Sequence, residues 1–232
     1  MPRRQTPGGR SWVTGGARRA LEFAEAANSW RAELSDGIRA FIAIDLDSAV
    51  RTAVSAVLAA LRQQVLADEV RWVRAEALHM TLRFLGNLGP EQVAPLARQV
   101  SAELESIVPF EMLLGAVQLF PSAQRPRVVA LEVGPLAPLE ALAAAVERGT
   151  RAAGFEPEER RFRAHLTLGR LRGRRGPETG DFSVPAGTAV TVSDTVLFQS
   201  VLGRDGAKYT PLERMQLGKP GGRSNSSGDD HP

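Results

Sequence analysis

The sequence predicts an α+β protein with antiparallel sheets. Strand-like segments are mixed with three segments of helical periodicity, and several neighbouring strands are separated only by short turns. No strand is followed by the G-x-G-x-x-G or G-x-x-x-x-G-K-[ST] pattern of nucleotide-binding parallel sheets. Together these observations favour antiparallel sheets over a doubly wound parallel sheet.

In the first half of the chain, strands are predicted at 39–46, 70–73, 78–86 and 110–120, and helices at 48–66 and 90–107. The first helix has apolar residues every three or four positions, which predicts one buried face: Val50, Val54, Val57, Leu58, Leu61 and Val65. Asp47 or Ser48 is placed to cap it, and Pro90 suits the start of the second helix.

In the second half, strands are predicted at 127–134, 161–171, 190–203 and 208–217, and an Ala-rich helix at 138–153. Gly154 is expected to end that helix, because glycine readily adopts the left-handed conformation that terminates helices. The sequence GRDG predicts a turn between the last two strands, and residues 173–181 predict a loop.

Composition divides the chain into three regions. Residues 1–37 are rich in arginine and glycine without strand alternation and predict a flexible N-terminal extension. Residues 218–232 predict a disordered tail. Residues 38–217 predict one globular domain.

Composition also excludes several kinds of site. The chain has no cysteine, which excludes disulfides, thiolate nucleophiles, zinc–thiolate sites and iron–sulfur clusters. A cytoplasmic location is expected on the same ground. No apolar run approaches the roughly 18 residues of a membrane span, so none is expected. The positive charge is nearly all arginine, which suits phosphate binding or reflects codon usage.

The strongest signal is a repeated tetrad. His79-Met80-Thr81-Leu82 and His165-Leu166-Thr167-Leu168 share the pattern H-x-T-L, although the chain has only three histidines. Both tetrads lie in predicted strands, where alternate side chains face opposite sides. Each strand then presents histidine and threonine on one face and apolar residues on the other. The repeat is consistent with an internal duplication.

Strict alternation extends these faces along the first motif strand. It places Arg83 beside His79 and Thr81, and Phe84 in the core with Leu82. Phe84 is therefore not expected to contact a base. Alternation also points Arg170 away from His165, unless Gly169 or the strand end redirects it.

Metal binding, nucleophilic catalysis and acid–base catalysis are the chemistries to consider for two imidazoles and two hydroxyls. A catalytic zinc usually needs three protein ligands, and no third ligand accompanies the motifs. No G-x-S-x-G nucleophile elbow is present. General acid–base catalysis fits, with one histidine accepting a proton and the other donating one to a leaving oxygen. From the residues alone, which histidine does which stays open.

With these motifs the chain resembles the 2H phosphoesterases, and among them the LigT-like RNA 2′,3′-cyclic phosphodiesterases, also called 2′–5′ RNA ligases. The resemblance covers about residues 38–217 and includes RAFIAIDL, RWVRAEALHMTLRFLG, PRVVALEV, GFEPEERRFRAHLTLGR and the late LFQSVLGRDGAKYTPLERMQL. It implies a two-lobed fold with pseudo-twofold symmetry, one motif strand from each lobe facing a central groove. Ala164 stands where the family usually has proline.

The resemblance also implies roles. His79 would donate a proton to the departing 3′ oxygen, His165 would activate water, and Thr81 and Thr167 would hold the phosphoryl oxygens. The implied reaction opens an RNA 2′,3′-cyclic phosphate to a 2′-phosphomonoester, without metal or cofactor. Arg170 matches a family arginine near the site. Further candidate substrate-binding residues are Arg83, from strand alternation, and Arg125 and Arg127, which flank a proline in a predicted loop. A monomer is expected.

Three alternatives stay open. The first is 2′–5′ ligation of RNA ends, since one site catalyses both directions of a reaction. The second is hydrolysis of small cyclic nucleotides. The third is a binding module that kept the fold, although a binder needs no pair of proton-transferring histidines.

Overall fold

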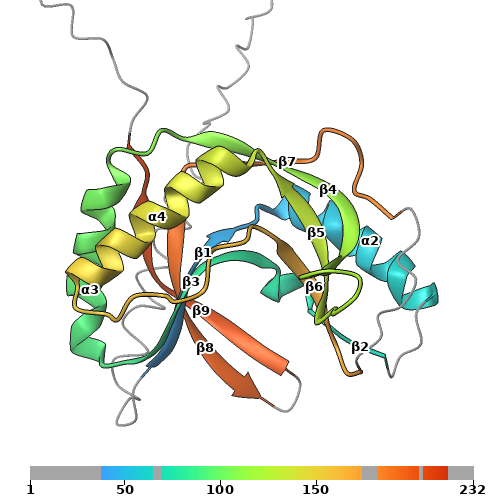
Figure 1. The fold of residues 1–232 in the computed structure, drawn as a ribbon, viewed down its shortest axis with the longest axis horizontal. Helices are drawn as coiled ribbons and strands as arrows, with labels where there is room; N and C mark the ends of the chain where they lie inside the picture. The colour runs from blue at the N-terminus through green and yellow to red at the C-terminus, as the bar shows by residue number, and fades with distance from the viewer. Residues whose placement is uncertain (1–37, 65–68, 174–181, 204–205, 219–232) are drawn as a thin grey trace, which may run out of the picture.

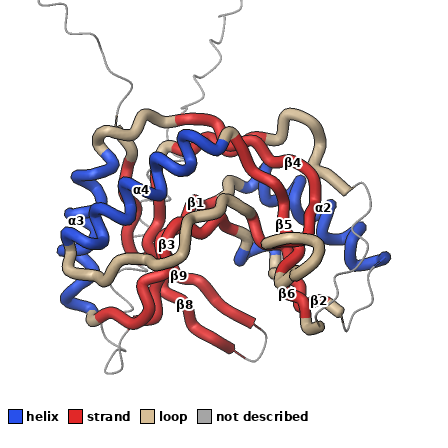
Figure 2. Tube along the Cα trace, in the orientation of Figure 1, coloured by secondary structure: helices blue, strands red, loops and turns tan. Residues whose placement is uncertain are grey.

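The computed structural model describes residues 38–64, 69–173, 182–203 and 206–218. Within them the chain forms two antiparallel sheets in two lobes, with helices packed around them (Figures 1 and 2). The strand order is β3-β1-β8-β9 in one sheet and β2-β6-β5-β4-β7 in the other. The predicted α+β class with antiparallel sheets is confirmed. The predicted extension at 1–37, and nearly all of the predicted tail and of the 173–181 loop, lie outside the described residues.

The strands match the sequence predictions closely. The first sheet contains β1 (Ile38–Asp45), β3 (His79–Leu88), β8 (Asp194–Gly203) and β9 (Gly206–Gln216). The second contains β2 (Val70–Trp72), β4 (Phe110–Phe120), β5 (Val128–Gly134), β6 (Leu166–Leu171) and β7 (Ala189–Val192).

The helices are α2 (Ser48–Gln64), the short 3₁₀ helix η2 (Ala75–Ala77), α3 (Pro90–Leu104) and α4 (Leu136–Ala152). Asp47 caps α2, because its Oδ1 accepts the backbone N–H of Val50 at 2.9 Å. The predicted apolar face of α2 is buried as far as Leu61. Gly154 follows α4 with φ of 90°, as predicted.

A strand–helix–strand unit occurs twice and accounts for the repeated motif. β1, α2 and β3 form the first copy and β5, α4 and β6 the second, and each strand pair is antiparallel. Each H-x-T-L tetrad lies at the start of the second strand of its unit, with His79 as the first residue of β3 and His165 directly before β6. α4 packs against α3 and β3 in the lobe at the left of Figure 1, while α2 lies in the other lobe.

Two strand predictions were partly wrong, one in where the strand begins and one in its continuity. The strand expected at 161–171 begins only at Leu166, because pairing with β5 stops at Leu131↔Leu166. The strand expected at 190–203 is two strands separated at Ser193. β7 pairs with β4 in the second sheet, whereas β8 pairs with β1 and β9 in the first, so the chain changes sheet there.

The two faces of the first sheet are apolar in different ways. One face adds Ile38, Ile42 and Ile44 to the main core, where they are fully buried. The opposite face carries a smaller cluster of buried residues that contains Phe41 and Phe198 and is flanked by Tyr209.

No helix among the described residues combines the length and apolar character that a membrane span requires.

Candidate active site

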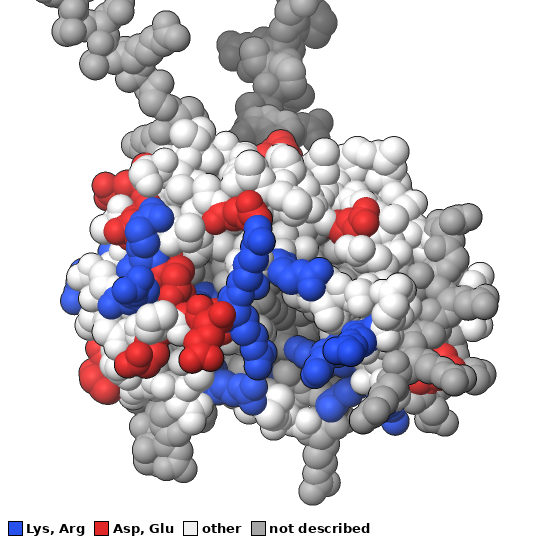
Figure 3. All heavy atoms as spheres, in the orientation of Figure 1, with Lys and Arg blue, Asp and Glu red and all other residues white. Residues whose placement is uncertain are grey.

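The two motif histidines stand at equivalent places in the two lobes. His79 is the first residue of β3, and His165 comes directly before β6. β3 and β6 contact each other, which brings the two motif strands together. The face shown in Figure 3 is hollowed near its centre, and basic side chains gather around the hollow. This arrangement suits a ligand that carries negative charge.

Both imidazoles are oriented by the same backbone contact. Nδ1 of His79 lies 2.8 Å from the carbonyl oxygen of Ala77, and Nδ1 of His165 lies 2.8 Å from that of Arg163. A carbonyl only accepts hydrogen bonds, so each Nδ1 carries a proton and donates it. In the neutral ring, Nε2 then holds the free lone pair. Nε2 of His79 lies 3.0 Å from Oγ1 of Thr81.

Aromatic rings pack against both imidazoles and restrict their rotation. The centroid of the Phe41 ring lies 4.7 Å from that of His79, and Tyr209 meets His79 edge-on at 5.0 Å. Phe120 stacks on His165 at 4.0 Å with 14° between the planes. Sequence reasoning missed these three aromatic residues. Their strands were predicted, but nothing in the local pattern says which ring meets a histidine.

Burial lowers the pKa of both histidines. Desolvation is the largest cause for His79, whose pKa falls from 6.5 to about 4, and the charges of Arg51 and Arg170 act in the same direction. The Ala77 carbonyl and the Asp45 carboxylate oppose this shift. Desolvation also lowers the pKa of His165, with contributions from Arg170 and Arg163. Arg170 is thus a charge that acts on both rings.

A bulge directly after the first motif reverses the alternation that the sequence predicts. The pairing of β3 with β1 passes from Ala43↔Thr81 to Ile42↔Arg83, so Leu82 is an extra residue. Arg83 consequently pairs with core-facing Ile42, and Phe84 pairs with Phe41 on the opposite face. The prediction that Phe84 lies in the core was wrong, because its ring is 55% exposed.

The second motif has the same bulge. β6 passes from Ala130↔Thr167 to Val129↔Gly169, which makes Leu168 the extra residue. This bulge redirects Arg170, which is exposed and lies near enough to both histidines to influence their pKa. Gly169 is required by close packing, because a Cβ there would lie 2.5 Å from Cγ1 of Val70. Arg170 and Phe84 are therefore equivalent positions, each five residues after its histidine.

Arg83 is engaged by the protein itself. Its Nε lies 2.9 Å from Oε2 of Glu147, its Nη1 lies 3.0 Å from Oε2 of Glu158, and its Nη2 donates to the carbonyl of Glu156. These contacts tie β3 to α4 and to the segment that leads to His165. Its role as a substrate contact stays a prediction, and this geometry favours a structural role instead.

Replacing Arg83 with methionine is expected to lower the free energy of unfolding by about 2 kcal/mol, because two carboxylates lose their partner around a side chain that is only 10% exposed. Urea unfolding measures this difference. Arg148→Met is the matched control, since that side chain is 53% exposed beside Glu103 and should contribute under about 1 kcal/mol. Unchanged stability with a raised KM would instead assign Arg83 to substrate binding.

Arg125 and Arg127 lie in the loop between β4 and β5, and their side chains are exposed. The backbone of Arg127 bonds to Phe120 and to Leu171, which holds this loop beside the end of β6. Phe120 is the ring that stacks on His165. The loop is therefore close to the second motif, and contact of either arginine with substrate stays a prediction.

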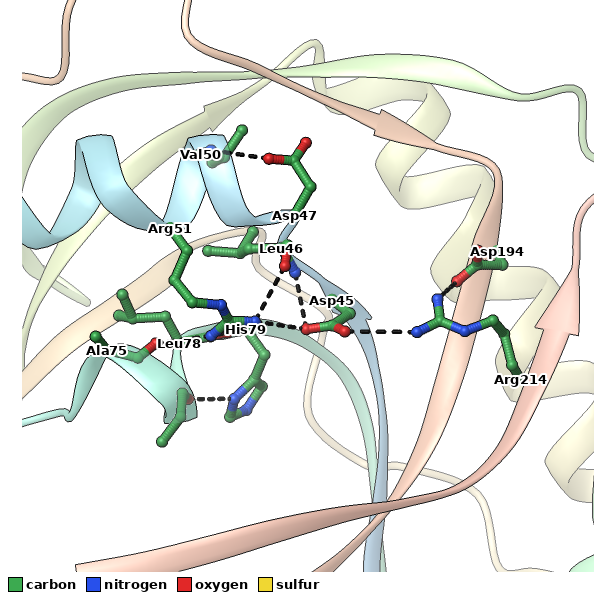
Figure 4. A network of polar contacts seen from close by, with 11 residues as sticks. Asp45, Leu46, Asp47, Val50, Arg51, Ala75, Leu78, His79, Asp194 and Arg214 are labelled. Atoms are coloured by element: carbon green, nitrogen blue, oxygen red, sulfur yellow. Dashed lines mark hydrogen bonds and ion pairs between the residues drawn. The ribbon is translucent and has the colours of Figure 1, made fainter. Parts of the chain in front are cut away.

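Charged groups behind His79 were not foreseen from the sequence. Asp45 and Arg51 form an ion pair at 2.8 Å, and Arg214 contacts both Asp45 and Asp194 (Figure 4). Asp45 pairs with His79 in the β1–β3 register.

No group of three histidine, aspartate or glutamate side chains among the described residues is arranged to hold a metal ion.

Two lobes that each present an H-x-T-L strand define a phosphoesterase of the two-histidine class. The chain belongs to the LigT-like phosphoesterase family, whose model matches residues 44–130 and 131–209. These two stretches contain one motif each, in agreement with the repeated strand–helix–strand unit.

Individual relatives agree with this assignment. The RNA 2′,3′-cyclic phosphodiesterase of Archaeoglobus fulgidus is 34% identical over 179 residues, which is 75% of this chain and 98% of the relative. That of Methanothermobacter thermautotrophicus is 32% identical and covers 78% of this chain and 99% of the relative. The crystal structure of E. coli LigT complexed with 3′-AMP matches with a TM-score of 0.65 and 26% identity, over 78% of this chain and 99% of that one.

Proposed function

We propose that this protein hydrolyses the 2′,3′-cyclic phosphate at an RNA end to a 2′-phosphomonoester, with His165 as general base and His79 as general acid. The observation that carries the proposal is the backbone contact that the two rings share. In each motif the histidine donates from Nδ1 to the carbonyl two residues earlier, at 2.8 Å. This contact leaves Nε2 as the atom that exchanges protons, as acid–base catalysis requires.

The reaction balances with these two groups. Nε2 of neutral His165 takes a proton from water while the water oxygen forms a bond to phosphorus. The bond between phosphorus and the 3′ oxygen breaks, and that oxygen takes the proton from Nε2 of protonated His79. The product has a 3′ hydroxyl and a 2′ phosphate. The two histidines then return to their starting states by exchanging protons with solvent.

The remaining groups are assigned by chemistry. The hydroxyls of Thr81 and Thr167 donate to the non-bridging oxygens of the phosphate. Arg170 stabilises the negative charge that increases on these oxygens, which explains an arginine at this position in the second motif. Phe84 at the equivalent position of the first motif offers an exposed ring on which a base can stack. Charge on one side and an aromatic ring on the other suit a nucleotide end.

The lowered pKa values predict a particular pH dependence. Burial disfavours the charged imidazolium, so each ring loses its proton at a lower pH than free histidine. The profile of kcat/KM should therefore be bell-shaped with both limbs below about pH 6.5, and its macroscopic pKa values belong to the pair. The profile of kcat should lie at higher pH, because the bound phosphate anion raises the pKa of both rings. A flat kcat/KM between about pH 5 and 9 would contradict two-histidine catalysis.

The proposed substrate class is tested by offering three substrates to the purified protein. These are an oligoribonucleotide ending in a 2′,3′-cyclic phosphate, a 2′,3′-cyclic mononucleotide, and the same oligoribonucleotide with a second RNA that has a 5′ hydroxyl. We expect hydrolysis of the RNA end with the highest kcat/KM. Turnover of the mononucleotide alone would indicate a small-nucleotide enzyme, and joined RNA would indicate ligation. No turnover by folded protein would indicate a binding module.

A further inference from the structure

Arg51 forms a dense set of contacts behind His79. Its Nη1 donates to the carbonyl oxygens of Ala75 at 2.6 Å and Leu78 at 3.1 Å. Its Nη2 donates to the carbonyl of Leu46 at 3.0 Å and to Oδ1 of Asp45 at 2.8 Å. One side chain from α2 therefore connects the end of β1 to both ends of the η2 segment (Figure 4).

These contacts surround the group that orients His79. The η2 segment runs from Ala75 to Ala77, and the carbonyl of Ala77 holds Nδ1 of His79. Because Arg51 binds the carbonyls of Ala75 and Leu78, it fixes the chain on both sides of Ala77. The position of the His79 ring thus depends on the Arg51 guanidinium, which acts through these backbone carbonyls.

Asp45 holds the guanidinium in turn. Its Oδ1 accepts from Arg51 and from its neighbour's backbone N–H, and its Oδ2 lies 3.5 Å from Nη2 of Arg214. Arg214 lies on β9 and also contacts Asp194 on β8. Because Asp45 is the register partner of His79, the pair and the ring share one end of the sheet. The Arg51 side chain, held by Asp45 and three backbone carbonyls, has little freedom to move.

We infer that Arg51 is a positioning residue for His79, acting through the η2 carbonyls and held by Asp45. The inference rests on the catalytic role proposed for His79. Proton transfer to a leaving oxygen requires a near-ideal distance, and a displacement of about 1 Å can lower a rate by about 10². Lysine at this position would keep the charge, but its single nitrogen cannot reach three carbonyls and a carboxylate at once.

The test compares Arg51→Lys with Arg62→Lys. Arg62 lies on the same helix, is exposed and donates to the carbonyl of Val73. Arg51→Lys is expected to lower kcat about 30- to 100-fold with KM within about threefold, whereas Arg62→Lys changes neither. The His79→Gln variant identifies the limb of the kcat/KM profile that belongs to His79. The same limb should move along the pH axis in Arg51→Lys. The charged and titratable groups around this ring are Asp45, Arg51, Arg170 and Tyr209.

A second readout does not depend on activity. Long-range ¹H–¹⁵N spectra report which ring nitrogen of a neutral histidine carries the proton. The wild-type protein should show His79 protonated at Nδ1, and Arg51→Lys should show a mixture of the two forms while His165 is unchanged. If the wild-type protein has no turnover, the proposed function fails and this spectrum still decides the role of Arg51.

Two results would overturn the inference. One is Arg51→Lys with unchanged kcat and an unchanged His79 tautomer. The other is an Arg51→Lys sample whose activity falls only in proportion to its fraction of folded protein, so that kcat per folded molecule is normal. If Arg51→Lys does not fold, Asp45→Asn replaces it, because the amide keeps the shape and loses the charge. It should shift kcat and the tautomer in the same direction, and a folded Asp45→Asn without either change contradicts the inference.

Discussion

Replacing His165 with alanine should lower kcat for the RNA cyclic phosphate by about 10³-fold, because the water then has no base to accept its proton. The imidazole is half-buried and stacks on Phe120 outside the buried core, so its removal should leave the fold intact. Single-turnover rates with end-labelled RNA measure the effect. Circular dichroism and the melting temperature confirm that the variant is folded.

His79→Ala is the paired variant and should lose a similar factor, because the 3′ oxygen then leaves without a proton. The two effects should not multiply in the double variant, since both groups act in one transition state. The affinity of each variant for a 2′-phosphorylated nucleotide should stay within a few-fold of wild type. Near-normal turnover by either single variant would contradict the proposed roles, and a large loss of affinity with unchanged kcat would favour a binding module.

Arg170→Ala is expected to have the second-largest effect, a loss of about 10² in kcat, because the guanidinium stabilises charge that grows in the transition state. Its removal should also raise the pKa of both histidines, since its charge lowers them, so both limbs of kcat/KM should move to higher pH. Arg170→Lys should recover part of the rate, as it keeps the charge without the bidentate geometry.

Arg172→Ala is the control for this experiment. Arg172 is also exposed and lies just beyond the end of β6, where its backbone bonds to Glu69. We expect no change in kcat or in the pH profile. Equal losses in the two variants would mean that Arg170 acts only through the general positive charge around the groove.

Much of this protein could be predicted from the sequence because its signals are local. Helical periodicity placed α2 and its buried face, and Gly154 marked the end of α4. The two H-x-T-L tetrads located both histidines on equivalent strands, since strand alternation holds over the three residues from histidine to threonine. Residues close together in the sequence were therefore predicted well.

The failures next to the two motifs share one physical cause, which is that β-bulges depend on the partner strand. Alternation beyond Leu82 predicted Arg83 in the groove and Phe84 in the core, and the bulge reversed both. The same bulge at Leu168 explains how Arg170 lies near both histidines. The Asp45–Arg51 pair was missed because Arg51 contacts the η2 segment, which is distant from it in the sequence.

The most direct measurement is the identity of the end group formed from an RNA 2′,3′-cyclic phosphate in the presence of EDTA. The proposed roles of His165 and His79 predict a 2′ phosphate and a free 3′ hydroxyl at a rate that EDTA does not lower, and a double alanine variant about as slow as either single variant. A 3′ phosphate, a rate that EDTA abolishes and zinc restores, or full activity of the double variant would contradict catalysis by these two histidines.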